Sequence, residues 1–220
     1  MTYHFVEDYN IHVSNLKQSH DLDQAMSLAV GANWDRADEV REILIQAGLK
    51  DGLDVLDFGC GSARICRTFP EKAQLKSYLG TDVVQDLLDY AKTITPDFYR
   101  FQLHQELNIP AADQTFDFAF CISVFTHLKQ AEIYLYMKDI GRVLRAGGTF
   151  VFTFLELADS TSHHIFQHTV NMTAGNMLHP LNQFIEKNQI EYMAMQTGFN
   201  IRQYISGDHI GQSVCIMDKI

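Results

Sequence analysis

The sequence predicts one α/β domain: a doubly wound, Rossmann-like sheet of seven mostly parallel strands with helices on both faces. From Leu53 onward, short apolar runs alternate with longer amphipathic stretches, which is the pattern of consecutive β-α-β units. Only residues 207–211 separate the last two apolar runs. Because so few residues cannot hold a crossover helix, the last two strands are expected to form an antiparallel hairpin.

The order of the apolar runs predicts the elements along the 220 residues. Strands are expected near residues 53–58, 76–81, 98–103, 116–123, 148–155, 200–206 and 212–217. Helical periodicity lies between them, near residues 63–69, 84–94, 130–143 and 181–197. Residues 1–50 are also mostly helical in pattern. We therefore expect a single domain, residues 1–220, in which residues 1–50 form a cap or lid and residues 51–220 form the core.

The composition excludes several classes of protein. Hydrophobic residues make up 46% of the chain and charged residues 20%, which is typical of a folded globular domain. The formal net charge of −10 repels phosphodiester backbones, so no nucleic-acid partner is expected. No apolar run reaches the roughly 20 residues that span a bilayer, and residues 1–10 have no leader pattern. We therefore expect no membrane partner and a cytoplasmic protein.

The cysteines and histidines predict neither a disulfide framework nor a metal site. The cysteines form no Cys-x-x-Cys pair and match no zinc spacing. Free thiols are therefore expected at Cys60, Cys66, Cys121 and Cys215. His164 and His168 have the i, i+4 spacing of two helical metal ligands, but the glutamate of an H-E-x-x-H motif is missing. We assign no metal ligand.

Residues 55–64, VLDFGCGSAR, have the form of a ligand-binding loop. A buried strand ends in Asp57, and the chain then turns through Gly59 and Gly61, where a backbone without side chains can approach a ligand closely. A dinucleotide fingerprint would place its third glycine at Arg64, so an NAD-dependent oxidoreductase is disfavoured. The carboxylate of Asp57 instead suits a ligand that carries an ammonium group.

A second acid stands at the end of the next expected strand. Asp82 follows Leu79-Gly80-Thr81 and lies 21 residues after Gly61. In doubly wound folds, a carboxylate at this place accepts hydrogen bonds from the hydroxyl groups of a ribose. A ligand with an amino acid at one end and a nucleoside at the other is S-adenosylmethionine.

With these motifs the chain resembles the class I S-adenosylmethionine-dependent methyltransferases, most clearly over residues 53–148. The matches follow in chain order: Asp57-x-Gly59-x-Gly61, Gly80-x-Asp82, the segments 116–118 and 124–128, and the turn at 142–148. The resemblance implies the doubly wound fold, methyl transfer from S-adenosylmethionine and release of S-adenosylhomocysteine. It also places Ala63 at the family's third glycine and leaves the contact to the adenine amino group to Gln105 or Glu106.

These observations together predict the residues of the site. Cofactor contacts are expected at Asp57, Gly59, Cys60, Gly61, Arg64, Asp82, Val83, Gln105, Glu106 and Ser123. His127 is the candidate catalytic base because it follows a strand end beside the cofactor loop, although a histidine there can also fix a turn. The acceptor pocket is expected at Phe125, Trp34, Tyr9 and His163. For its aromatic members, core packing or a plain helix cover is the alternative.

The predicted function is methyl transfer from S-adenosylmethionine to an oxygen or nitrogen atom, a carboxylate included, of a small-molecule acceptor. No Asn-Pro-Pro-Tyr or Asp-Pro-Pro-Tyr motif of amino-methylating DNA enzymes follows the fourth strand, and residues 121–123 offer no carboxylate to a metal. A catalytically silent cofactor-binding protein and a methyltransferase of proteins or RNA are the alternatives. We expect a monomer or homodimer in which residues 1–34 form a mobile lid.

Overall fold

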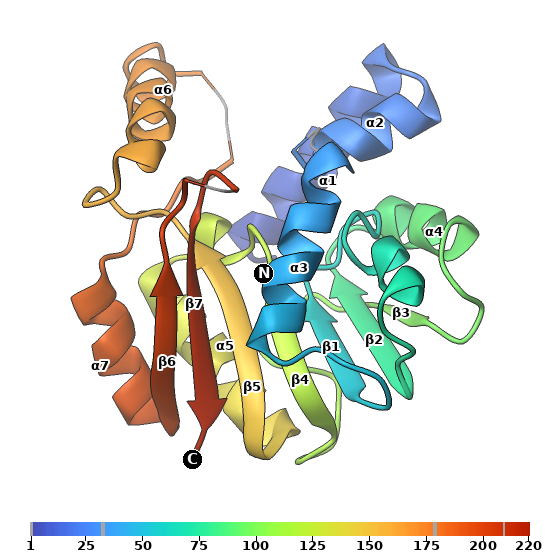
Figure 1. Cartoon of the computed structure of the whole chain (residues 1–220). Helices are drawn as coiled ribbons and strands as arrows, with labels where there is room; N and C mark the ends of the chain where they lie inside the picture. The colour runs from blue at the N-terminus through green and yellow to red at the C-terminus, as the bar shows by residue number, and fades with distance from the viewer. Residues whose placement is uncertain (1, 32–33, 178–179, 209) are drawn as a thin grey trace.

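The computed structural model describes residues 2–31, 34–177, 180–208 and 210–220 (Figure 1). Its centre is a seven-stranded sheet in the order β3-β2-β1-β4-β5-β7-β6. The strands are β1 (Asp54–Phe58), β2 (Ser77–Asp82), β3 (Arg100–Leu103), β4 (Phe116–Cys121), β5 (Leu144–Phe154), β6 (Phe199–Ile205) and β7 (Ser213–Lys219). Parallel pairing joins β3, β2, β1, β4 and β5, whereas β7 pairs antiparallel with both β5 and β6. The predicted sheet with its C-terminal hairpin is confirmed.

Helices cover both faces of the sheet because successive side chains of a strand point to opposite sides. They are α1 (His4–Ser19), α2 (Leu22–Ala29), α3 (Ala37–Ala47), α4 (Gln85–Thr93), α5 (Gln130–Val143), α6 (His163–Ala174) and α7 (Lys187–Thr197). On one face, Leu56 and Phe150 pack with α5, α7 and the start of α1. On the other, Val55 and Val151 pack with α3 and with the 3-10 helix η2 (Cys66–Glu71). Figure 1 shows α3 in front of the sheet and α5 behind it.

The helix expected at residues 63–69 is wrong. Residues 61–65 form turns and a bend, and the chain continues as the 3-10 helix η2. Ala63 has a φ of 68°, in the left-handed region that an α-helix does not adopt, and Pro70 inside η2 has no N–H to donate. The glycine-rich loop therefore leads into a loose turn rather than into the first turn of an α-helix.

The helix expected at residues 181–197 begins only at Lys187. The residues ahead of it are held by other backbone bonds: the N–H of Gln183 donates to the carbonyl oxygen of Thr126 at 2.7 Å, and that of Ile185 donates to Leu155 at 2.8 Å. Two further differences lie nearby. Strand β5 begins at residue 144 rather than 148, and α6 is a helix that the sequence patterns did not predict. None of the residues of α6 is buried.

Helices α1 and α2 form a cap above the C-terminal ends of the strands (Figure 1). The cap is joined to the core at both ends of α1. Nε2 of His4 lies 3.0 Å from a carboxylate oxygen of Glu132 in α5, and Nζ of Lys17 lies 2.6 Å from a carboxylate oxygen of Asp86 in α4. Within the expected cap of residues 1–50, α3 instead packs on the sheet. Residues 1 and 32–33 of that segment lie outside the described residues.

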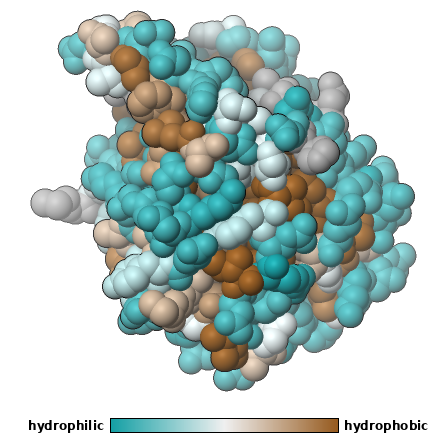
Figure 2. Space-filling view, turned by 60° about the vertical axis from the view of Figure 1, so that its left-hand side comes forward, coloured by the Kyte–Doolittle hydropathy of each residue, from teal (hydrophilic) through white to brown (hydrophobic). Residues whose placement is uncertain are grey.

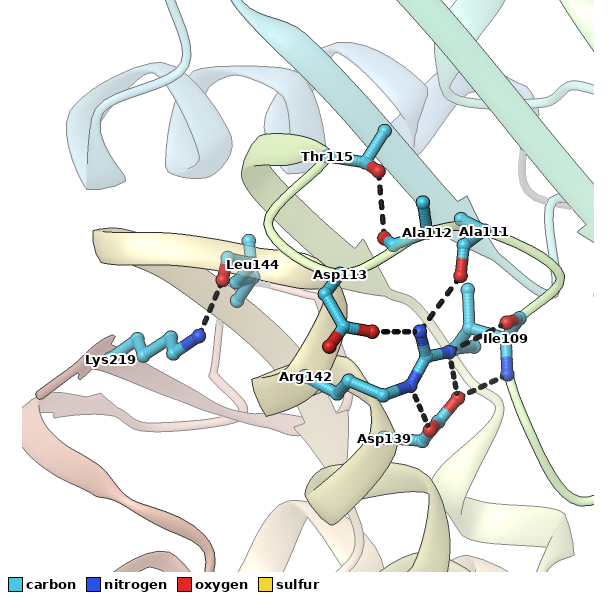
Figure 3. A network of polar contacts seen from close by, with 9 residues as sticks. All are labelled: Ile109, Ala111, Ala112, Asp113, Thr115, Asp139, Arg142, Leu144 and Lys219. Carbon is cyan, nitrogen blue, oxygen red and sulfur yellow. Dashed lines mark hydrogen bonds and ion pairs between the residues drawn. The ribbon is translucent and has the colours of Figure 1, made fainter.

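A cluster of charges fixes the connection between β3 and β4 (Figure 3). Arg142 of α5 donates to the carbonyl oxygens of Ile109 and Ala111 and forms ion pairs with Asp113 and Asp139. Asp139 also accepts a hydrogen bond from the N–H of Ile109 at 2.5 Å. The connection that begins at residues 104–106, beside the strand ends, is therefore held at its far end by α5.

None of the helices in the described part of the chain has the length and apolar character needed to cross a membrane. Figure 2 shows a mostly hydrophilic face with separate hydrophobic patches. Phe166 and Val170 of α6 and Met195 of α7 are among the exposed apolar side chains. In this view the exposed apolar residues are dispersed rather than gathered on one broad surface.

Candidate active site

A cavity of about 340 Å³ lies at the C-terminal ends of β1, β2 and β4, beneath the cap. In the sheet, β1 stands between β2 and β4. The chain runs from β1 outward to β2 and β3 and then returns to β4 on the other side of β1. Open α/β sheets bind their ligands at such a reversal of strand order. Because the cap supplies Phe5, Tyr9 and His12 from α1 and Val30 from the end of α2, the cavity is walled on the side away from the sheet.

The glycine-rich loop passes beneath the cap where side chains do not fit. Gly59 and Gly61 have φ angles of 76° and 56°. A Cβ atom at Gly59 would lie 2.4 Å from Cγ2 of Val124, and one at Gly61 would lie 2.5 Å from Cγ1 of Val30. Both the backbone angles and the contacts therefore require glycine at these two positions.

Asp82 ends β2 and lines the cavity. Its Oδ2 accepts a hydrogen bond from the N–H of Gly61 at 2.9 Å, and its Oδ1 accepts one from the N–H of Val84 at 3.0 Å. Burial raises the pKa of Asp82, and these backbone donors act in the opposite direction. An ionised carboxylate has about four lone-pair positions, so two remain for the hydroxyl groups of a ligand.

Asp57 is the penultimate residue of β1, lines the same cavity and is only 3% exposed. The hydroxyl of Tyr78 donates to Oδ2 of Asp57 at 2.6 Å. Burial raises the pKa of Asp57 to about 7; the Tyr78 hydrogen bond opposes the rise and the nearby charge of Asp82 adds to it. A cation beside Asp57 would favour its ionised form. The carboxylate caps no helix, because η2 starts beyond Ile65 without a side-chain cap.

Arg64 lines this cavity and a smaller one of about 120 Å³ beside it, to which Arg36, Ser123 and Gln212 also contribute. Within the described residues, its guanidinium group has no hydrogen bond or ion pair. Burial lowers the pKa of Arg64, and the charge of Asp57 counteracts this. Other arginines are paired with carboxylates, namely Arg41, Arg142, Arg145 and Arg202. A partly desolvated cation without a protein partner suits a site that binds a carboxylate.

His127 lies in the short 3-10 helix η3 (Phe125–His127) after β4 and lines the cavity. Its Nδ1 lies 2.7 Å from the carbonyl oxygen of Leu181. Because a carbonyl oxygen only accepts, Nδ1 carries the proton. Burial lowers the pKa of His127, so the ring is neutral near pH 7 and Nε2 keeps its lone pair. His127 thus fixes the backbone near Leu181, which is the structural role that the sequence analysis kept as an alternative. It also has a free proton acceptor, Nε2, in a ring that lines the cavity.

The remaining predicted cofactor residues divide into two groups. Gly59, Cys60, Val83 and Ser123 line the cavity, whereas Gly61, Gln105 and Glu106 are not part of its lining. Nε2 of Gln105 donates to the carbonyl oxygen of Val83 at 2.9 Å. The carbonyl oxygen of Glu106 accepts from the hydroxyl of Tyr136 at 2.8 Å. The contact of either side chain with adenine stays a prediction.

Among the residues expected to hold the acceptor, Tyr9 lines the cavity. Phe125 is 1% exposed and packs against Phe152 in the core, with 4.9 Å between the ring centroids. The ring of Trp34 lies beneath the guanidinium group of Arg67, 4.1 Å from its central carbon. His163 is on α6, where its Nε2 lies 3.0 Å from the carbonyl oxygen of Leu157. Phe125, Trp34 and His163 thus lie outside the wall of the cavity.

The residues of the wall that the sequence analysis did not single out include Phe5, His12 and His104. The first two carry a readable signal, because Phe5, Tyr9 and His12 have the i, i+4, i+7 spacing that places side chains on one face of a helix. His104 directly follows β3, and Asp82 ends β2, the strand beside it. Because open α/β sheets bind ligands at the carboxyl ends of their strands, its position could have indicated a site residue.

Among the described residues, no three histidine, cysteine or acidic side chains are grouped as metal ligands would be. The free thiols expected at the cysteines are confirmed, and all of them are buried. His164 and His168 are exposed on α6, away from the wall of the cavity.

Comparison with known proteins gives one family model and many solved structures. Residues 56–152 match a model described as a methyltransferase domain. An S-adenosylmethionine-dependent methyltransferase from Mesorhizobium loti shares 16% identity at a TM-score of 0.66, over 85% of this chain and 100% of that one. Magnesium protoporphyrin IX methyltransferase from Synechocystis PCC 6803, solved with bound S-adenosylhomocysteine, shares 15% identity at a TM-score of 0.65, over 89% of this chain and 87% of that one. A complex of the Haloferax volcanii Trm112 methyltransferase activator with a methyltransferase shares 14% identity at a TM-score of 0.71, over 98% of this chain and 96% of that one.

Residues 56–152 form a methyltransferase domain, and the chain has the fold of S-adenosylmethionine-dependent methyltransferases of known structure. The solved structures, all below 25% identity, support the fold, and the family model supports the methyltransferase domain. The predicted family, enzyme class and cofactor are confirmed: the enzyme uses S-adenosylmethionine and releases S-adenosylhomocysteine.

Proposed function

We propose that this enzyme methylates an oxygen or nitrogen atom of a small-molecule acceptor, with His127 accepting the proton that the acceptor loses. One observation carries the proposal. A single cavity brings Asp57, Arg64 and Asp82 together with Nε2 of His127. The first three residues suit the two ends of the cofactor, and the fourth suits an acceptor that must be deprotonated.

The charged residues match the functional groups of the cofactor. The carboxylate of Asp82 would accept hydrogen bonds from the ribose hydroxyls, and that of Asp57 would face the ammonium group. Arg64 would pair with the carboxylate that shares a carbon atom with this ammonium. The pKa values of Asp57 and Arg64 respond to each other's charge, so the two groups are close enough to serve one amino acid. When bound, S-adenosylmethionine supplies a methyl group whose bond to a positively charged sulfur breaks, leaving the electron pair on sulfur.

The chain's own contribution is then position, exclusion of water and a proton acceptor. The cap would cover the acceptor and keep bulk water from the reacting atoms. It is suited to this because Val30 lies directly on the glycine-rich loop. In addition, a hydrogen bond between His4 and Glu132 and an ion pair between Lys17 and Asp86 hold the two ends of α1. An acceptor held in line with the sulfur–carbon bond needs no metal or covalent intermediate.

His127 would take the proton of a hydroxyl or amino group at Nε2. The hydrogen bond from Nδ1 to Leu181 keeps the ring in the tautomer with the lone pair on Nε2. It also stabilises the imidazolium once the proton has moved. A carboxylate acceptor would not need this residue, so the hydrogen bond favours a protonated nucleophile.

The size and charge of the site favour a small acceptor. A cavity of about 340 Å³ under a cap lies within the range of small-molecule pockets. A net charge of −10 disfavours RNA. Methylation of a protein and a silent cofactor-binding role are the alternatives, and both are outcomes of the same experiment.

The proposal is tested by transfer of a labelled methyl group from S-adenosylmethionine. A panel of small hydroxyl and amine acceptors is compared with unstructured peptides and RNA, using the wild type and His127→Ala. We expect label in a small acceptor and a loss of about 100-fold or more in turnover for His127→Ala, with S-adenosylhomocysteine binding retained. Label only in peptide or RNA would overturn the acceptor class. Cofactor binding without any transfer would indicate a silent binder.

A further inference from the structure

The wall of the cavity holds few formally charged residues. Among the described residues of its wall, only Asp57, Arg64 and Asp82 are formally charged near pH 7, when the histidines are counted as neutral. Asp57 is the penultimate residue of β1, Asp82 is the last residue of β2, and Arg64 lies in the turns after β1. The proposed function assigns all of them to the cofactor. The residues that α1 contributes to the wall, Phe5, Tyr9 and His12, add no cation that could compensate an anionic acceptor.

Aromatic rings line part of this wall. Phe5, Tyr9 and His12 come from one face of α1, and His127 and Tyr136 come from the core. The ring of Tyr9 stands edge-on to both histidines, with centroids 6.2 Å from His12 and 5.3 Å from His127. Phe5 and Tyr136 meet edge-on at 6.5 Å. Such a wall offers ring faces and edges to a planar ligand.

Two imidazoles flank Tyr9, and both are neutral. Burial lowers the pKa of His12 as well as that of His127. A neutral imidazole has one donor and one acceptor nitrogen, so the two rings can hold a hydroxyl group that both donates and accepts. A carboxylate or phosphate between them would have no cation partner among the described residues that α1 contributes to the wall. Burying such an unpaired charge is costly.

The cofactor's own adenine is the competing occupant of this wall. Asp82, the proposed ribose partner, ends β2, and the nearest strand beyond it is β3. His127 follows β4, on the opposite side of β1. The nucleoside and His127 are therefore expected on different sides of the glycine-rich loop.

We infer that the acceptor is an uncharged, planar ring compound with a hydroxyl group, which lies against Tyr9 and places that hydroxyl between His12 and His127. The inference rests on the proposed function and narrows its acceptor to one chemical class. It gives His12 a role in selecting the acceptor, and His127 the role of receiving its proton.

The test measures binding of three matched probes to the enzyme loaded with S-adenosylhomocysteine. Naphthol is planar and neutral, naphthoate is planar and anionic, and decahydronaphthol keeps the hydroxyl without the planar ring. We expect naphthol to bind at least about tenfold more tightly than either of the others. His12→Ala should weaken naphthol binding by about tenfold and leave S-adenosylhomocysteine binding unchanged. His168→Ala, at an exposed histidine of α6, is the matched control and should alter neither.

Three results would overturn the inference: no saturable binding of naphthol, equal affinity for naphthol and naphthoate, or displacement of naphthol by S-adenosylhomocysteine. The last would assign the ring-lined wall to adenine. Failure of S-adenosylhomocysteine itself to bind would count against the proposed function instead. Because His12→Ala is judged on binding of both ligands, a folding defect would be recognised by loss of both, and His12→Asn then repeats the test with a smaller change of volume.

Discussion

Nδ1 of His127 and the carbonyl oxygen of Leu181 lie 2.7 Å apart, although 54 residues separate them in the chain. Leu181 belongs to the segment between α6 and α7, which is bonded to the core through the N–H groups of Gln183 and Ile185. This segment therefore determines which nitrogen of His127 carries the proton. The tautomer of the proposed base is therefore fixed by a segment that lies far from it in the sequence.

The pH dependence of turnover should reveal His127 as the base. Burial lowers its pKa below 6.5, with His12 adding to this effect and the carbonyl of Leu181 and the charge of Asp8 opposing it. The neutral form is the active one, so turnover should stay constant as the pH falls to about 6.5 and decrease only below it. Steady-state rates at saturating substrate concentrations measure this decrease at acidic pH. The decrease should disappear in His127→Ala, and an unchanged profile in that variant would exclude the role.

Cofactor affinity should increase as the pH rises through about 7, because burial raises the pKa of Asp57 to about 7 and only the ionised form attracts an ammonium group. We expect S-adenosylhomocysteine to bind about tenfold more tightly at about pH 7.5 than at about pH 5.5. Calorimetry at several pH values checks this. Asp57→Asn should flatten the curve, whereas Asp89→Asn, on the exposed side of α4, should keep it. A slope that persists without the Asp57 carboxylate would contradict the assignment.

Asp82→Ala should weaken binding of S-adenosylmethionine by about 1.5 to 3 kcal/mol, because charge-assisted hydrogen bonds to ribose would be lost from a desolvated site. The same change frees the N–H groups of Gly61 and Val84. Asp82→Asn is the matched variant, since its amide oxygen can still accept one of these bonds. Calorimetry should place it between the wild type and alanine. Equal affinity in all three proteins would remove Asp82 from the site.

Gly61→Ala should destabilise the protein by about 1 to 3 kcal/mol, through a left-handed φ and a clash of Cβ with Val30. Gly52→Ala separates the two causes, because Gly52 has a φ of 77° and nothing within 4 Å of its Cβ position. Urea unfolding should show a smaller loss there. Combining Gly61→Ala with Val30→Ala should recover part of the loss, and strict additivity would mean that the cap does not press on the loop.

Chelators should leave the activity unchanged. An activated methyl group needs no Lewis acid, and residues 121–123 at the end of β4 have no carboxylate for a metal. Turnover measured before and after dialysis against EDTA checks this. Loss of turnover that a divalent ion restores would contradict it, and His164→Ala and His168→Ala would then show whether those histidines hold the ion.

The local pattern of the sequence was sufficient to predict the sheet and to place Asp57, Gly59 and Asp82 near one another. Strands bury alternating or continuous apolar residues, and their carboxyl ends meet at one edge, so Asp57, Gly59 and Asp82 could be assigned to one ligand from spacing alone. The antiparallel hairpin followed from the shortness of residues 207–211. These features depend on neighbours in the chain, which is why they were predictable.

Tertiary packing decided the rest. The turn at Ala63 replaced the expected helix because the loop must fit beneath Val30 and Val124. Phe125 entered the core rather than a pocket because rings of β5 pack against it. The neutral wall around His12 exists only because α1 lies across the strand ends, opposite His127. Contacts between distant segments set the burial that fixes these pKa values and tautomers, and no local sequence pattern records them.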